Sequence, residues 1–147
     1  MKTASSGVRG VSRARHEMVD HVSELTLRIR APSFPELLSE ATRAFGELVP
    51  PTMRGRRLRE RQDFEVGGID RASLLVQWLN EMVYLCEVEQ WLPAVVEEVR
   101  ERGETLWLRA SGVSLTRPFV LVKAATLHGA RVSEDSEGLT AEVTLDI

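Results

Sequence analysis

The stretch ELTLRIR at residues 24–30 decides the expected fold, because its apolar and polar side chains alternate strictly. A period of two predicts a half-buried strand, and we expect extended backbone to continue N-terminally from it as far as Arg15. The last nine residues, LTAEVTLDI at 139–147, alternate in the same way. Half-buried strands are therefore predicted near both ends of the sequence.

Two helices are predicted between these strands. Ser33 and Glu36 form a capping-box pattern with Pro35 in the first turn, and the prolines at 50 and 51 end that helix. Asp70 is a suitable N-cap for a second helix after the glycine turn at 67–68. The apolar residues expected on the buried sides of the two helices are Leu37, Leu38, Ala41, Ala44, Phe45, Leu48, Leu74, Leu75, Trp78, Leu79, Met82, Val83, Leu85 and Cys86.

The remaining segments favour hairpins. A strand is expected through Phe64 and Val66, and residues 94–100 and 105–110 flank a loop that contains Gly103. Residues 119–132 are strand-rich, and a turn at 135–138 leads into the last strand. We expect a single α+β domain at 15–147, with two main helices packed on a largely antiparallel, hairpin-built sheet, after a disordered basic tail at 1–14.

Composition excludes several classes of protein. The 147 residues contain one cysteine and carry a formal net charge of −3, so a disulfide scaffold and a thiolate zinc site are excluded. A reducing cytoplasm is the expected compartment. No apolar run approaches the roughly 20 residues of a membrane span, and no signal-peptide pattern precedes Arg15, so we expect neither secretion nor a membrane anchor. The acidic total argues against sequence-blind coating of DNA.

No set of residues indicates catalysis. The glycines at 67–68 lack the lysine and spacing of a phosphate-binding loop, and Cys86 has no adjacent base, so we interpret it as a packing thiol. The three histidines lack the i, i+4 spacing of a helical metal site. We therefore expect no enzyme.

Two acidic features remain open at this level. The cluster from Asp20 to Glu24 is interpreted as a turn followed by a solvent-facing strand position. Asp146 places a side-chain carboxylate beside the terminal carboxylate of Ile147, and hard cations take such ligands. The alternative is a chain end that frays in solvent.

Five segments, in this order along the chain, resemble the archease family, whose members assist an RtcB-type RNA ligase in tRNA splicing and RNA repair. They are Asp20-His21 with Glu24, residues 33–38, residues 75–81, VKAATLHG at 122–129, and VTLDI at 143–147.

The resemblance implies a metal-binding accessory factor that promotes guanylylation and multiple turnover of the ligase. It implies metal ligands at Glu24, Asp146 and the carboxylate of Ile147. It also implies a functional surface that includes Asp20, His21, Lys123, Thr126 and His128. In an alternating strand Lys123 and His128 point to opposite faces, unless a bulge near Gly129 shifts the register.

The metal expectation is adjusted where this sequence departs from the family pattern. Glu24 stands where the family has aspartate, and Thr26 replaces the usual glycine. Because glutamate is one methylene longer, Ca²⁺, with flexible geometry and oxygen distances of roughly 2.3–2.6 Å, is favoured over Mg²⁺.

Rival functions stay open beside this one. The first rival is a metal-free binding or chaperone-like module that acts on another protein or RNA, and a free-standing hydrolase is a more distant candidate. Two interpretations of the arginine cluster also stay open. It is expected either to contact RNA or an acidic face of the ligase, or to be a solvated strand edge protected by charge. The cluster consists of Arg54, Arg56, Arg57, Arg59 and Arg61.

Overall fold

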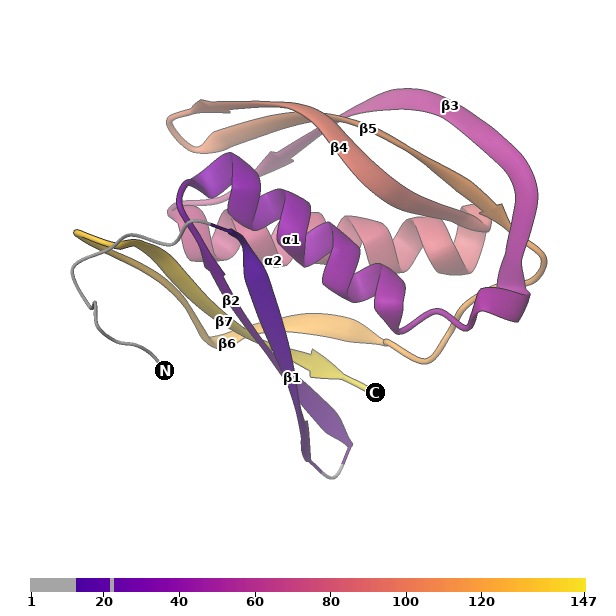
Figure 1. Ribbon diagram of the computed structural model, residues 1–147, viewed down its shortest axis with the longest axis horizontal. Helices are drawn as coiled ribbons and strands as arrows, with labels where there is room; N and C mark the ends of the chain where they lie inside the picture. The colour runs from indigo at the N-terminus through magenta and orange to yellow at the C-terminus, as the bar shows by residue number, and fades with distance from the viewer. Residues whose placement is uncertain (1–12, 22) are drawn as a thin grey trace.

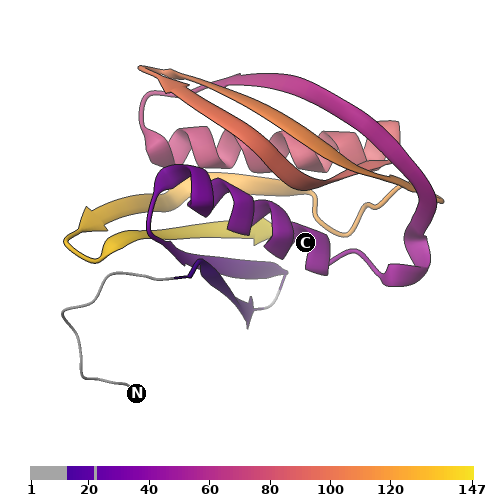
Figure 2. The same cartoon turned by 45° about the horizontal axis from the view of Figure 1, so that its top comes forward.

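Two antiparallel sheets enclose two helices in three layers (Figures 1 and 2). The computed structural model describes residues 13–21 and 23–147, with the backbone alone for residues 20–21 and 57–60. The α+β class and the largely antiparallel pairing are confirmed, with two sheets where one was expected. The predicted tail at 1–14 lies outside the described residues apart from Arg13 and Ala14.

The four-stranded sheet has the order β1-β2-β7-β6. Its members are β1 (Arg15–His21), β2 (Glu24–Ala31), β7 (Gly138–Asp146) and β6 (Ala124–Asp135). The last strand of the chain is therefore central and pairs with β2 on one side and β6 on the other. The extended segment predicted from Arg15 to Arg30 is divided into the two strands of a hairpin, and its reversal falls within the turn interpreted at residues 20–24.

The two helices begin at the predicted caps. In α1 (Phe34–Glu47) the Ser33 Oγ accepts the Glu36 amide at 3.3 Å and donates to the Glu36 carboxylate at 2.9 Å. In α2 (Arg71–Tyr84) Asp70 and Ser73 form a capping box. A π-helical segment, η3 (Leu85–Glu89), continues α2, and a short 3-10 turn, η2 (Pro51–Met53), follows α1.

The three-stranded sheet has the order β3-β5-β4 and covers the other side of the helices (Figure 2). It consists of β3 (Arg54–Gly67), β5 (Thr105–Leu115) and β4 (Trp91–Arg102). Gly103 turns the predicted hairpin with a φ of 59°. The strand predicted from residue 119 begins only at Ala124, because Phe119 and Val122 are buried core residues of an irregular segment.

The core lies between the sheets and around the helices. Trp78 is fully buried, and its indole nitrogen donates to the buried Thr42 hydroxyl at 2.9 Å. Cys86 is also fully buried, and this burial raises the pKa of its thiol to about 12. A thiol with such a pKa stays protonated at neutral pH and packs as an apolar group. None of the helices in the described part of the chain is long and apolar enough to span a membrane.

Candidate functional site

The candidate site lies on the face of the four-stranded sheet that points away from the helices, which we call the outer face. Burial alternates along β2 and β7, so residues with even numbers in these strands face outward. The strand register then orders the outward side chains into rows that cross the sheet. Each row can be assessed for the balance of its charges.

The row at the end of β7 is acidic. Glu24 lies directly opposite Asp146, and both residues are exposed. Directly opposed residues of antiparallel strands have Cβ atoms about 4.5–5.5 Å apart, and like charges in such a pair repel each other. Among the described side chains, neither carboxylate has an ion pair or a hydrogen bond. We call Glu24 and Asp146 the acidic row.

The chain end beside this row is fixed by its backbone. The Ile147 amide donates to the Ser23 carbonyl at 3.0 Å, and the Lys123 amide donates to the Asp146 carbonyl at 2.7 Å. The Ile147 side chain packs against the core. These contacts argue against a frayed terminus, because they hold the last residue between the β1–β2 turn and the segment that precedes β6.

The turn that meets the chain end has an unusual backbone conformation. Ser23 has a φ of 67°, in the left-handed region that side chains other than glycine rarely adopt. Such conformations persist where the surrounding structure enforces them, and they are concentrated at functional sites. Here the Ser23 carbonyl accepts the terminal amide, so the conformation contributes directly to the placement of Ile147.

The donor set of this end suits a hard cation. Two side-chain carboxylates face each other, and the terminal carboxylate of an anchored residue lies next to Asp146. Ca²⁺ binds oxygen ligands of this kind with flexible geometry. In the described part of the chain, no three His, Cys, Asp or Glu side chains converge, so a third protein ligand there would be the main-chain carboxylate.

The other residues expected on this surface lie around the acidic row. The backbone pairs His21 with Glu24 and Asp20 with Leu25, and their side chains lie outside the described atoms. Thr126 pairs with Thr144, one row away from Asp146 on the same face. Thr26, at the departure from the family pattern, also pairs with Thr144 from the other side.

A bulge in β6 changes the predicted relation of Lys123 and His128. Lys123 lies just before β6 and touches Asp146 through its backbone amide. The register of β6 shifts between Thr126 and Arg131, and Gly129 within this bulge has a φ of 76°. His128 is exposed in the bulge, so strict alternation between the two residues does not apply.

The arginine cluster is divided between several environments. Arg54 donates to the Gly46 carbonyl at 2.6 Å and so stabilises the last turn of α1. Arg61 pairs with Glu97 at 3.3 Å. Arg56 is exposed, and the side chains of Arg57 and Arg59 lie outside the described atoms. The structure thus assigns a local structural role to the first member of the cluster.

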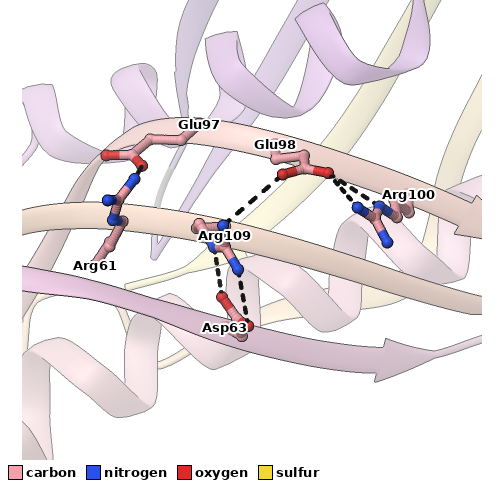
Figure 3. Close-up of polar contacts among 6 residues, drawn as sticks. All are labelled: Arg61, Asp63, Glu97, Glu98, Arg100 and Arg109. Carbon is pink, nitrogen blue, oxygen red and sulfur yellow. Dashed lines mark hydrogen bonds and ion pairs between the residues drawn. The ribbon is translucent and has the colours of Figure 1, made fainter.

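Further ion pairs lie on the outward face of the three-stranded sheet, where a chain of contacts apart from the Arg61–Glu97 pair links Asp63, Arg109, Glu98 and Arg100 (Figure 3). Arg109 donates to Asp63 at 2.9 Å, and this hydrogen bond lowers the pKa of the Asp63 carboxyl. Arg100 contacts Glu98 at 2.8 Å. Each of these arginines therefore has a carboxylate partner, as expected of a solvated sheet face.

Sequence reasoning missed a histidine that joins β1 to α1. The two ring nitrogens of His16 contact the carboxylates of Glu40 and Glu47, each at 2.7 Å. Burial of the ring opposes its charge, but the hydrogen bonds that the charged ring donates to the two carboxylates outweigh this effect and raise the pKa of His16. These partners lie 24 and 31 residues away in the sequence, so no local pattern indicates them.

The comparisons with known proteins all point to the same family, and they cover almost the whole chain. Residues 16–147 match the archease protein family. The archease of Archaeoglobus fulgidus is 29% identical over 137 residues, which cover 90% of this chain and 99% of that protein. The archease of Methanopyrus kandleri is 26% identical over 139 residues, which cover 89% of this chain and 98% of that protein.

Two solved structures share the fold. The solution structure of Methanobacterium thermoautotrophicum protein 1598 has a TM-score of 0.65 at 21% identity and covers 90% of this chain and 98% of its own. The crystal structure described as an archease, possible chaperone, from Thermotoga maritima has a TM-score of 0.59 at 19% identity. That match covers 88% of this chain and 94% of the Thermotoga protein.

Proposed function

The chain belongs to the archease family, and from this premise we propose that it is a metal-binding accessory factor of an RtcB-type RNA ligase. Its role is to promote guanylylation and multiple turnover of the ligase in tRNA splicing and RNA repair. The ligase carries out the joining reaction itself. This protein contributes a binding surface and a cation.

The observation that carries this proposal is the unpaired acidic row beside an anchored chain end. Glu24 and Asp146 face each other without a cationic partner among the described side chains, while each of the arginines drawn in Figure 3 on the neighbouring sheet has a carboxylate partner. Two opposed carboxylates destabilise the pairing of β2 with β7 unless a cation lies between them. A bound cation would remove this repulsion.

The residues of this chain divide the work at such a site. Glu24, Asp146 and the terminal carboxylate of Ile147 would hold the ion, and Ca²⁺ tolerates the longer Glu24 side chain better than Mg²⁺ does. Ala124, the small residue opposite Asp146 on β6, adds little bulk beside the carboxylate. Because the ligands are exposed, the ion would remain accessible to the surface of the ligase.

The direct test is turnover of a purified RtcB-type ligase from the same source. The parent protein should restore multiple turnover, whereas Glu24→Gln and Asp146→Asn should not. Glu104→Gln is the matched control, because this exposed glutamate lies in the β4–β5 turn and the substitution makes the same change of charge. Equal activation by all four proteins would contradict the proposal.

The second candidate is a metal-free binding or chaperone-like module acting on another protein or RNA. The description of the Thermotoga structure as a possible chaperone supports it. So do the exposed apolar residues Val120 and Leu121, which lie close in sequence to Lys123. This candidate predicts that a chelator leaves the activity unchanged and that the acidic-row variants behave as the parent.

A further inference from the structure

The opposite end of the outer face carries the reverse charge. Arg15 on β1 lies directly opposite Arg30 on β2, Arg30 lies opposite Thr140 on β7, and Thr140 lies opposite Ser133 on β6. Two guanidinium groups and two hydroxyl groups therefore share one line across the sheet. We call these four residues the basic row.

An intermediate row shows what charge balance looks like on the same face. Glu17, Arg28, Glu142 and Arg131 alternate in sign from β1 to β6. Arg28 contacts Glu17 at 3.0 Å and Glu142 at 2.8 Å, and Arg131 contacts Glu142 at 3.0 Å. Here every charge has a partner of opposite sign in the adjacent strand.

The basic row has no such balance. Like charges directly opposite each other destabilise an antiparallel pair. Among the described residues Arg15 has no ion pair, and the one carboxylate near Arg30 is Glu137, at 3.7 Å from Nη2. Arg30 makes no hydrogen bond to a described residue, and its Nε is buried without a partner. One donor of its guanidinium fork is therefore left without an acceptor.

We propose that the basic row binds an oxyanion of the phosphate class. A phosphate placed between Arg15 and Arg30 would remove their mutual repulsion and accept charge-assisted hydrogen bonds from both guanidinium groups. The hydroxyl groups of Thr140 and Ser133 extend the line of donors toward β6. A free phosphate and a phosphodiester of an RNA backbone present the same chemistry to this row.

This site is separate from the acidic row. Glu24 and Arg30 lie six residues apart on β2, which is about 20 Å at the rise of a strand. The anion site therefore needs neither the cation nor the ligase for binding, and it can be tested on the isolated full chain. Its failure would leave the proposed function unaffected.

The first experiment titrates the full-length protein, by calorimetry, with inorganic phosphate and separately with a short single-stranded RNA. The variants Arg15→Gln and Arg30→Gln should each weaken binding by at least about tenfold, or about 1.4 kcal/mol, since each removes the charge-assisted hydrogen bonds of one guanidinium group to the anion. Arg131→Gln is the matched control, because it removes the same charge from the same face. It should bind as the parent does.

A substitution at Glu137 should have the opposite effect on phosphate affinity. Its carboxylate is the one competitor for Arg30 among the described side chains. Glu137→Gln should therefore tighten phosphate binding severalfold. A structural role of Arg30 alone predicts no gain in affinity from this change.

The melting temperature in the absence of added anion is an independent test of the repulsion within the basic row. Arg15→Gln should raise the melting temperature in phosphate-free buffer, because it removes the repulsion with Arg30. Arg131→Gln should not raise it, because that change breaks the ion pair with Glu142. Added phosphate should raise the melting temperature of the parent but not that of Arg30→Gln.

The outcomes separate the two sources of the oxyanion. Binding of a probe that is lost in Arg15→Gln and Arg30→Gln supports the site, and the probe that binds identifies the source, whereas binding that both variants retain overturns the proposal. No binding of either probe by the parent, or equal loss in Arg131→Gln, overturns the proposal. Binding abolished equally by chloride at the same ionic strength also overturns it, because it indicates general screening of surface charge.

Discussion

The contact of His16 with two carboxylates predicts a specific dependence of stability on pH. The pKa of His16 is raised in the folded protein, so the stabilisation is fully present below its unfolded value of about 6.5. It is lost as the pH rises through the higher folded value. The free energy of unfolding should therefore fall as the pH rises from about 6.5 through the raised pKa of His16.

The magnitude follows from the surroundings of the two contacts. Glu40 is 4% exposed, so its hydrogen bond with the charged ring is shielded from water, whereas Glu47 is 58% exposed and contributes little after solvent screening. Arg43 pairs with Glu40 and partly compensates that carboxylate when His16 loses its proton. We expect a loss of about 1–2 kcal/mol, or about 3–6 °C in melting temperature for a chain of this size.

The assay is thermal unfolding followed by circular dichroism across this pH range, for the parent and for His16→Gln. Subtracting the two profiles removes the contributions of all other titrating groups. His128→Asn is the control, because it removes an exposed histidine and leaves the His16 contacts in place. Parallel profiles for the parent and His16→Gln would refute the reasoning.

Three further predictions concern the core and its close packing. Thr42→Val should cost about 1–3 kcal/mol in unfolding free energy, because the buried Trp78 indole loses its acceptor; chemical denaturation measures this, and an unchanged midpoint would contradict it. Gly112→Ala should prevent normal folding, because its Cβ would lie within 2.0 Å of the Leu92 carbonyl oxygen; a parental two-dimensional NMR spectrum would show that β4 and β5 can separate. Cys86, with a pKa of about 12 and no exposed surface, should react with iodoacetamide at neutral pH only after unfolding; rapid alkylation of the native protein would show that the core opens.

Local patterns in the sequence predicted the elements that local physics determines. Asp70 caps α2 and Gly103 turns the β4–β5 hairpin as expected, because a side-chain oxygen near free amides and a positive φ are properties of a few adjacent residues. The turn interpreted at residues 20–24 is present between β1 and β2, but the left-handed conformation of Ser23 was not predicted, since nothing in its residue type favours it. The strand-rich segment at 119–132 contains β6, but the strand begins only at Ala124, because burial, which the pattern cannot distinguish from strand pairing, explains the apolar Phe119 and Val122.

The carboxylates of Asp146 and Ile147 could be singled out from the sequence, but their pairing with Glu24 was predictable only through the family resemblance. Glu24 and Asp146 are 122 positions apart in the sequence, and no spacing rule places them opposite each other. The basic row is assembled in the same way from four strands, so its charge balance is visible only once the register is known. Long-range pairing is the part of the fold that residue patterns leave undetermined.

Calcium binding by a chain with an altered terminus tests the central claim most directly. An added C-terminal glycine converts the Ile147 carboxylate into a neutral amide and leaves Glu24, Asp146 and the packed Ile147 side chain in place. Calorimetric titration with Ca²⁺ should give one site in the parent and in a variant that lacks residues 1–14. The extended chain should bind at least about tenfold more weakly, because a hard-cation site loses an anionic ligand. Equal Ca²⁺ affinity of the extended chain and the parent would contradict the account of a metal held at the chain end.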